Sequence, residues 1–156
     1  MEIEGEVQIA AAPATVWQRL NDARFLERCI PGCTTMTQLG EHTYECAILA
    51  KYGPVKATFT TTLEVSNIKA PESYTLTGRG QGGAAGFGEG CADVVLLPMA
   101  EGTCLRYAAR INAGGKIAQV GARLLSSTTR KLTAQFFTAF AAGLGGVAPS
   151  AGAPEA

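Results

Sequence analysis

The residues of this sequence that could do chemistry are few and scattered. General acid–base catalysis needs a positioned histidine or a pair of carboxylates in apolar surroundings. The single histidine, His42, falls in a predicted turn, while Glu64 and the glutamates of residues 2–6 fall on polar strand faces. Glu89, beside a glycine-rich stretch, is the one acid that remains a candidate. Since these spacings assemble no nucleophile–base pair, the sequence favours a binding protein over an enzyme.

The cysteines predict neither a disulfide framework nor a metal site. Their number, five, is odd, and no two have the CxxC spacing. Cys29 and Cys33 enclose Ile-Pro-Gly, which indicates a tight turn, because no neighbouring base would activate a thiolate. With one histidine, a zinc ligand set is short of donors, so we expect no metal and no cofactor. The opening MEIEGEV is not a signal peptide, and together with these cysteines it predicts a cytoplasmic protein.

The glycine-rich stretch at residues 78–90 contains GxGxxG, the pattern of dinucleotide-binding sites. Such a site requires the motif to open a helix after a parallel strand. Here the glycines continue to Gly90 and an alternating pattern follows, which is a poor start for a helix. We therefore expect a bulged or sharply bent pair of strands, where glycine permits curvature or close approach.

The overall charge gives no reason to expect a nucleic-acid partner. Lys and Arg total 13, equal to Asp and Glu, so no global field draws the chain to nucleic acid or to an anionic membrane. A balanced total charge does not exclude local basic patches. No run reaches the roughly 18 apolar residues that span a bilayer. The nearest, residues 136–148, is typical of the end of a core helix.

Apolar periodicity predicts an α+β domain. Alternation of apolar and polar residues indicates strands, and Pro13 and Asn21 open two short helices that end at Pro31. From 115 to 144 the period becomes helical. We assign residues 1–145 to one ligand-binding domain and the Pro/Gly/Ala-rich residues 146–156 to a flexible tail. The predicted strands are residues 2–9, 43–48, 55–66, 74–76, 92–96 and 104–111.

A long amphipathic helix needs a wide apolar surface, which a curved antiparallel sheet supplies. The interior between them is by default a solid core. Two features favour a cavity: Gly121 and Thr128 stand on the helix stripe where a dense core prefers larger apolar residues, and Tyr107 brings a hydroxyl. The residues predicted to line this pocket are Phe25, Ile30, Pro31, Phe59, Phe87, Tyr107, Leu124, Thr128 and Phe136.

Several stretches together resemble the G-subunit family of carbon monoxide dehydrogenase, a branch of the START-like (SRPBCC) superfamily. They occur in the family's order and extend over most of the chain. The resemblance implies a helix-grip fold of the START/Bet v 1 type, with a curved antiparallel sheet, two short helices and one long C-terminal helix. The matching stretches are residues 16–22, 29–33, 52–59, 78–90, 114–125 and 135–137.

The resemblance also implies a function. Relatives are non-catalytic accessory proteins of molybdenum hydroxylases of the carbon monoxide dehydrogenase type. They are thought to aid recruitment of the enzyme to the inner face of the cell membrane. Some are thought to hold an apolar ligand, a lipid or a quinone such as menaquinone or ubiquinone, in the cavity. The expected partners are therefore a hydrophobic small molecule, hydroxylase subunits and the membrane periphery, but no nucleic acid.

Two other functions stay open on the sequence. A START-like small-molecule cyclase or hydrolase would use Glu89 or Tyr107 as its acid. A pure assembly scaffold would have a solid core in place of a cavity.

Overall fold

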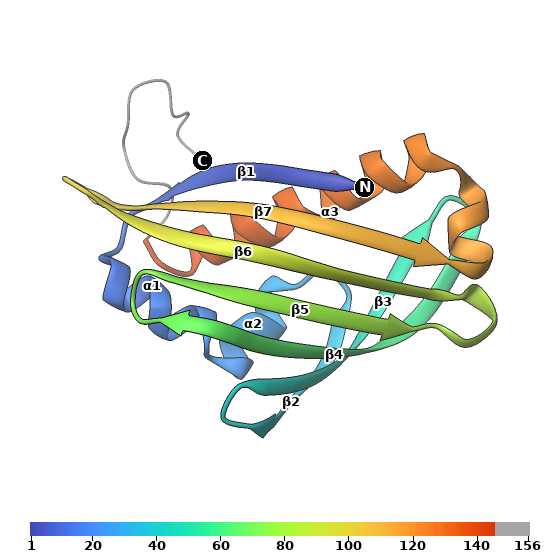
Figure 1. Ribbon diagram of the computed structural model, residues 1–156, viewed down its shortest axis with the longest axis horizontal. Helices are drawn as coiled ribbons and strands as arrows, with labels where there is room; N and C mark the ends of the chain where they lie inside the picture. Colours follow the sequence, from blue (N-terminus) through green and yellow to red (C-terminus); the bar gives the residue numbers. More distant parts are fainter. Residues whose placement is uncertain (146–156) are drawn as a thin grey trace.

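The computed structural model describes residues 1–145, which form one antiparallel sheet and a set of helices (Figure 1). The strands are β1 (Glu2–Ile9), β2 (Cys33–Gly40), β3 (Thr43–Tyr52), β4 (Val55–Lys69), β5 (Ser73–Gln81), β6 (Phe87–Met99) and β7 (Gly102–Gly114). The α-helices are α1 (Pro13–Leu20), α2 (Ala23–Cys29) and α3 (Ala122–Ala142), and the 3-10 helices are η1 (Gly83–Ala85) and η2 (Gly115–Val120).

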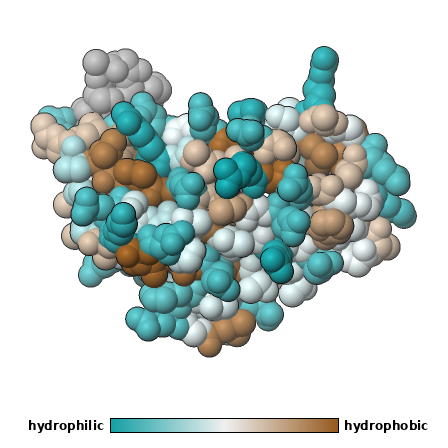
Figure 2. All heavy atoms as spheres, in the orientation of Figure 1, coloured by the Kyte–Doolittle hydropathy of each residue, from teal (hydrophilic) through white to brown (hydrophobic). Residues whose placement is uncertain are grey.

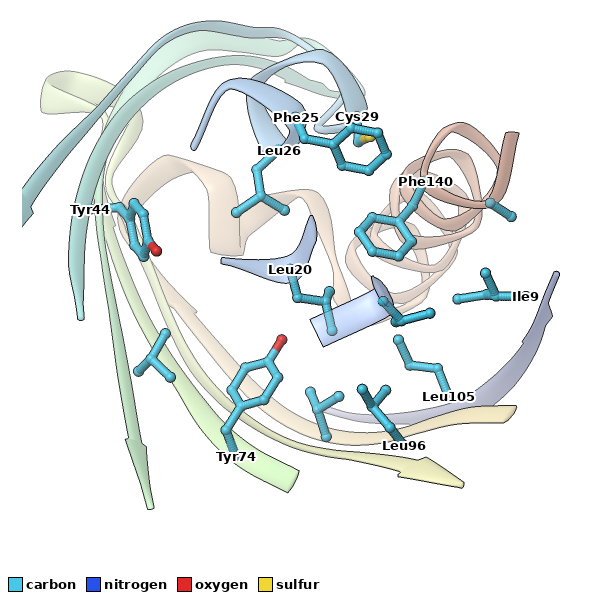
Figure 3. Close-up of a cluster of buried hydrophobic side chains, with 14 residues drawn as sticks. Ile9, Leu20, Phe25, Leu26, Cys29, Tyr44, Tyr74, Leu96, Leu105 and Phe140 are labelled. Atoms are coloured by element: carbon cyan, nitrogen blue, oxygen red, sulfur yellow. The ribbon is translucent and has the colours of Figure 1, made fainter. Parts of the chain in front are cut away.

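The seven strands follow the order β1-β7-β6-β5-β4-β3-β2, and every neighbouring pair is antiparallel. Helices α1 and α2 carry the chain from β1 at one edge to β2 at the other. The sheet curves, and α3 lies along its concave side (Figures 1 and 3). The predicted α+β helix-grip architecture is confirmed.

Alternation along β4 places Phe59 and Val65 on the buried face and leaves Lys56 and Thr60 exposed. On the convex face, hydrophilic side chains are scattered over the strands (Figure 2). Strand β2 was absent from the predicted set. Its sequence CTTMTQLG is mostly polar and its residues are mostly exposed, so this edge strand has no strong apolar alternation to reveal it.

The predicted helix at 115–144 is divided in two. Residues 115–120 form the 3-10 helix η2, and α3 begins only at Ala122. The break is at Gly121, whose φ of 100° lies in a region open to glycine and strained for other residues. Gly121 therefore caps α3 and is not part of its inward stripe, which corrects the prediction.

The main apolar core lies where the C-terminal half of α3 meets α1, α2 and the sheet. Phe140 and Ile9 are fully buried, and Leu105 is 1% exposed (Figure 3). The rings of Phe25 and Phe140 meet edge to face, with centroids 5.3 Å apart. A second, smaller apolar cluster of Phe59, Ala85 and Ile117 lies apart from this core.

Two predictions concern features beyond the folded core. The tail predicted at residues 146–156 lies outside the described residues. Among residues 1–145, no helix combines the length and the apolar character that crossing a bilayer requires.

Asp22 begins α2, and its charge should make a small, pH-dependent contribution to stability. Its Oδ1 accepts from the backbone N–H of Phe25 at 3.2 Å, and its Oδ2 accepts from Nη1 of Arg19 at 2.9 Å. The Phe25 N–H, and secondarily Arg19, lowers the pKa of this carboxyl. We expect Asp22→Ala to reduce the free energy of unfolding by about 1 kcal/mol at pH 7 in urea titrations.

The sign of the pH dependence follows from the lowered pKa. The contribution of the Asp22 charge is complete above the carboxyl's unfolded pKa of about 3.9 and is lost as the pH falls through the lower folded value. Asp22→Asn is the matched control, because asparagine caps a helix without a charge. The difference between wild type and Asp22→Asn should disappear on acidification. A difference that stays constant down to about pH 2 would contradict this account.

Candidate functional site

A cavity of about 510 Å³ lies between α3 and the concave face of the sheet, and it is partly open to solvent. Its volume falls in the range of roughly 300–1,000 Å³ that is usual for small-molecule sites. The surface of the cavity is mainly apolar, with contributions from Ile3 of β1, strands β3–β7 and all three α-helices. The predicted hollow between helix and sheet is therefore present.

The floor of the cavity is made of glycine. Gly78 and Gly80 of β5 and Gly88 and Gly90 of β6 all border it. They form two cross-strand pairs, Gly78 with Gly90 and Gly80 with Gly88. Since alternate residues of a strand face one side, four adjacent inward positions carry no side chain. The missing side chains leave space at this place, and the most open of the four positions is Gly88, where a Cβ would meet no atom closer than 3.9 Å.

The stretch at 78–90 is thus the hairpin of β5, η1 and β6, which confirms the predicted pair of strands. Its register continues from residue 73 to the turn without a bulge, so the bend is made by η1 and its flanking residues. Gly83 and Gly86 have positive φ values of 61° and 102°, which explains why the turn itself requires glycine.

Aromatic side chains form one wall. Tyr107 stacks on Phe137 with a centroid separation of 4.9 Å, and Phe136 meets Phe137 edge to face at 5.0 Å. Phe59 packs with Ala85 and Ile117 in a second small core near the β5–β6 turn. Such surfaces favour flat or branched apolar guests, which gain from contact with rings.

Several hydroxyl groups of the cavity lining form hydrogen bonds within the protein. The hydroxyls of Tyr52 and Thr129 lie 3.0 Å apart and join β3 to α3. The Tyr44 hydroxyl donates to the carbonyl oxygen of Asn21 at 3.1 Å, and Thr133 donates to the carbonyl oxygen of Thr129 at 2.8 Å. The first two bonds join β3 to α3 and to the α1–α2 connection, and the third lies within α3.

Two other tyrosine hydroxyls form no such hydrogen bond in the described part of the chain. Within residues 1–145, Tyr74 and Tyr107 have no hydrogen-bond partner for their hydroxyl, and both residues border the cavity. The Tyr74 hydroxyl points toward the interior (Figure 3). Burial raises the pKa of both phenols, so both keep their proton at neutral pH. The Tyr74 hydroxyl can therefore donate a hydrogen bond to an acceptor on a guest, whereas the Tyr107 hydroxyl lies over Gly5 of β1, which does not border the cavity.

Of the predicted lining residues, five border the cavity: Ile30, Pro31, Phe59, Tyr107 and Phe136. Ile30 and Pro31 belong to the turn between α2 and β2, where Gly32 has a φ of 78°, so the turn interpretation of Cys29–Cys33 is confirmed. All the cysteines of the chain are free, and burial raises the pKa of the Cys29 and Cys33 thiols. That the five residues bind a ligand stays a prediction.

The other four predicted residues, Phe25, Phe87, Leu124 and Thr128, do not border the cavity. Phe25 is 5% exposed and belongs to the core around Phe140. Phe87 is 40% exposed, because it alternates with Gly88, which faces inward.

Leu124 and Thr128 belong to α3 but lie outside the part of its surface that borders the cavity. Leu124 packs against Gly53 at the β3–β4 turn. On the next turn of the helix, Thr129 borders the cavity and Thr128 does not. The residues of α3 that border the cavity are Thr129, Leu132, Thr133, Phe136 and Phe137.

The inward glycines and the tyrosines Tyr44, Tyr52 and Tyr74 were not predicted as cavity residues. A signal was available, since Tyr74, Gly78 and Gly80 share one parity on β5. Glu89 and Arg79 also border the cavity, yet both are exposed because they alternate with the inward glycines. The side chain of Glu89 is thus on the outer side of the sheet.

Comparison with known proteins gives one family. The model of the carbon monoxide dehydrogenase G-subunit (CoxG) family matches residues 5–145. No curated protein matches the chain.

Several solved structures share the fold. A conserved protein from Geobacillus kaustophilus is 29% identical, with a TM-score of 0.86, over 93% of this chain and 95% of that one. The Zhui aromatase/cyclase from Streptomyces sp. R1128 is 11% identical, with a TM-score of 0.68 and 93% of both chains covered. The protein Ara h 8.0201 is 12% identical, with a TM-score of 0.66, over 92% of this chain and 97% of that one.

Proposed function

Because this chain belongs to the carbon monoxide dehydrogenase G-subunit (CoxG) family, we propose that it is a non-catalytic accessory protein of a molybdenum hydroxylase of the carbon monoxide dehydrogenase type. In this role it binds an apolar small molecule, an isoprenoid quinone such as menaquinone or ubiquinone, and aids recruitment of the enzyme to the inner face of the cell membrane. The observation that carries the proposal is the apolar cavity of about 510 Å³ over a glycine floor.

A quinone fits the chemistry of this cavity. Burial of its ring and prenyl carbons contributes roughly 25 cal/mol per Å². The bare floor formed by Gly78, Gly80, Gly88 and Gly90 leaves room for a flat ring against the backbone. The carbonyl oxygens of a quinone are acceptors, and the hydroxyl of Tyr74 is a donor without a partner among residues 1–145. A few polar groups in an apolar site are what fixes the orientation of a ligand.

Glu89 and Tyr107 are the two acids that a START-like cyclase or hydrolase would use, and the position of one and the pKa of the other favour a binding role. The side chain of Glu89 is exposed on the outer side of the sheet. Burial raises the pKa of Tyr107, which moves it further from the neutral range where a general acid works best.

The proposal is tested by titrating the chain with a short-chain quinone, decylubiquinone, and following the fluorescence of Trp17. This is the single tryptophan, and its ring lies 5.4 Å from that of Tyr74, which borders the cavity. A quinone in the cavity should therefore quench Trp17 to a plateau at one equivalent. Native mass spectrometry of the chain purified with its host's membranes should show a bound apolar molecule, and hydroxylase subunits should co-purify.

Free N-acetyltryptophanamide serves as the control for quenching by collision and by light absorption. Quenching of Trp17 that rises linearly, as it does for the free amide, would contradict ligand binding. Co-purification of the hydroxylase without any recoverable ligand would instead favour a pure assembly scaffold.

A further inference from the structure

The charges of this neutral chain are distributed unevenly. Residues 46–63 and 112–145 contain no aspartate or glutamate. The same two segments hold six of the 13 basic residues, namely Lys51, Lys56, Lys116, Arg123, Arg130 and Lys131. The chain as a whole has no net charge, so these two segments carry a local excess of positive charge.

The fold brings four of these cations to one end of the molecule. The β3–β4 turn packs on the start of α3, since a side chain at Gly53 would meet Leu124. Helix η2 contacts both η1 and β4. In Figure 1 the β3–β4 turn, η1, η2 and the start of α3 lie together at the right of the view. We call Lys51, Lys56, Lys116 and Arg123 the cationic end.

The cationic end is not explained by the stability of the fold. All four residues are exposed, and none forms an ion pair within residues 1–145. Lys51 and Lys56 are direct partners across β3 and β4. Like charges directly opposite each other on a sheet are destabilising. A partner of opposite charge outside the molecule would remove this cost.

The cationic end also adjoins the cavity. The hairpin that carries Lys51 and Lys56 supplies Ala50, Tyr52 and Phe59 to the lining, and Tyr52 is bonded to Thr129 of α3. On the outer face of the same hairpin, next to Lys51, Leu49 is 44% exposed. Pro54, at the tip of the turn, is exposed as well.

We propose that the cationic end docks on an anionic phospholipid bilayer and places the cavity next to the membrane surface. Lysine and arginine side chains reach phosphate groups at the level of the lipid headgroups, while Leu49 and Pro54 offer apolar contact at the same end. The inference rests on the proposed function, because a bilayer is the store of an isoprenoid guest. It identifies the surface by which that guest would be collected.

The test is sedimentation of the full chain with vesicles of phosphatidylglycerol and phosphatidylcholine, compared with phosphatidylcholine alone. The variant Lys51→Glu/Lys56→Glu reverses two charges and keeps a like-charged cross-strand pair, so the sheet is not further strained. Each basic residue near an anionic surface strengthens binding about fivefold, so the variant should bind the anionic vesicles at least about 25-fold more weakly.

The matched control is Arg24→Glu/Lys69→Glu, which makes the same change in net charge. Both residues are exposed, and Lys69 is at the opposite end of β4 from Lys56, roughly 40 Å along the strand. This control should bind vesicles nearly as the wild type does. Equal loss in both variants, or no preference of the wild type for phosphatidylglycerol, would overturn the docking surface. Binding of polyglutamate without binding of anionic vesicles would assign the cationic end to an acidic protein and overturn it too.

Quinone titration separates this proposal from the proposed function. If Lys51→Glu/Lys56→Glu binds decylubiquinone from solution like the wild type but not vesicles, the docking surface is supported and the cavity is unaffected. If vesicles bind to the cationic end but no quinone quenches Trp17, docking stands and the ligand-binding function fails. If quinone binds and vesicles do not, docking alone is overturned.

Discussion

Replacing Gly88 with leucine should strongly weaken binding of an apolar ligand and leave the fold intact. Gly88 borders the cavity, and a Cβ built on it would meet only the backbone oxygen of Asn112, at 3.9 Å. The rest of a leucine side chain would then occupy the space above the paired Gly80. We expect the affinity for decylubiquinone to fall at least about a hundredfold, which corresponds to about 2.7 kcal/mol.

The choice of Gly88 matters, because its neighbours have less room. At Gly90 a Cβ would lie 3.0 Å from the backbone oxygen of Arg110, and at Gly80 it would lie 3.0 Å from Oγ1 of Thr61. Leucine at Gly90 would therefore disturb the sheet backbone, and leucine at Gly80 would displace the Thr61 side chain. At Gly88 the leucine side chain packs against apolar walls, and glycine weakens a strand. The free energy of unfolding should therefore equal that of the wild type or be slightly higher.

Gly40→Leu is the matched control for this experiment. Gly40 ends β2, does not border the cavity, and has no atom within 4 Å of its would-be Cβ. This variant should bind decylubiquinone like the wild type. Wild-type affinity in a folded Gly88→Leu variant would show that the ligand binds elsewhere.

The largest effect on stability is expected from Phe140→Ala. Phe140 is fully buried, and its ring centroid lies 5.3 Å from that of Phe25 and 5.7 Å from that of Phe136. Removing a buried phenylalanine ring costs about 3–5 kcal/mol, because the transfer of the ring from water is lost and a cavity remains. Against a usual total of about 5–15 kcal/mol, urea unfolding should show a much lower midpoint.

Phe87→Ala is the control of the same chemical type. Its side chain is 40% exposed and packs over Gly114, so we expect a loss of about 1 kcal/mol. Because Phe140 does not border the cavity, the folded fraction of Phe140→Ala should still bind decylubiquinone. A loss of stability no greater than that of Phe87→Ala would show that α3 is not held at this point.

The sequence was informative wherever a residue's role depends on near neighbours. The alternation from Val55 to Ser66 placed β4 correctly, because one wet and one dry face impose a period of two. The edge strand β2 carries no such pattern. Gly121 was placed on the helix because spacing counts residues and does not record φ.

The candidate site was only partly predictable for a related reason. The sequence predicted large apolar residues as the pocket lining. Phe25 instead packs in the core, while Gly78 and Gly88 border the cavity. The cationic end could not be predicted from net charge, since Lys51 and Arg123 come together only through the packing of the β3–β4 turn on α3. Contacts between distant segments decide both features.

The paired glycines have a further consequence for the history of such proteins. The cavity can be narrowed by one mutation at Gly88 and widened again by its reversal, with no change to the pairing of the strands around it. Loss and recovery of the guest therefore require neither a new fold nor a passage through an unstable ancestor. A form of this framework that binds the guest and a form that does not can then differ by one substitution at Gly88.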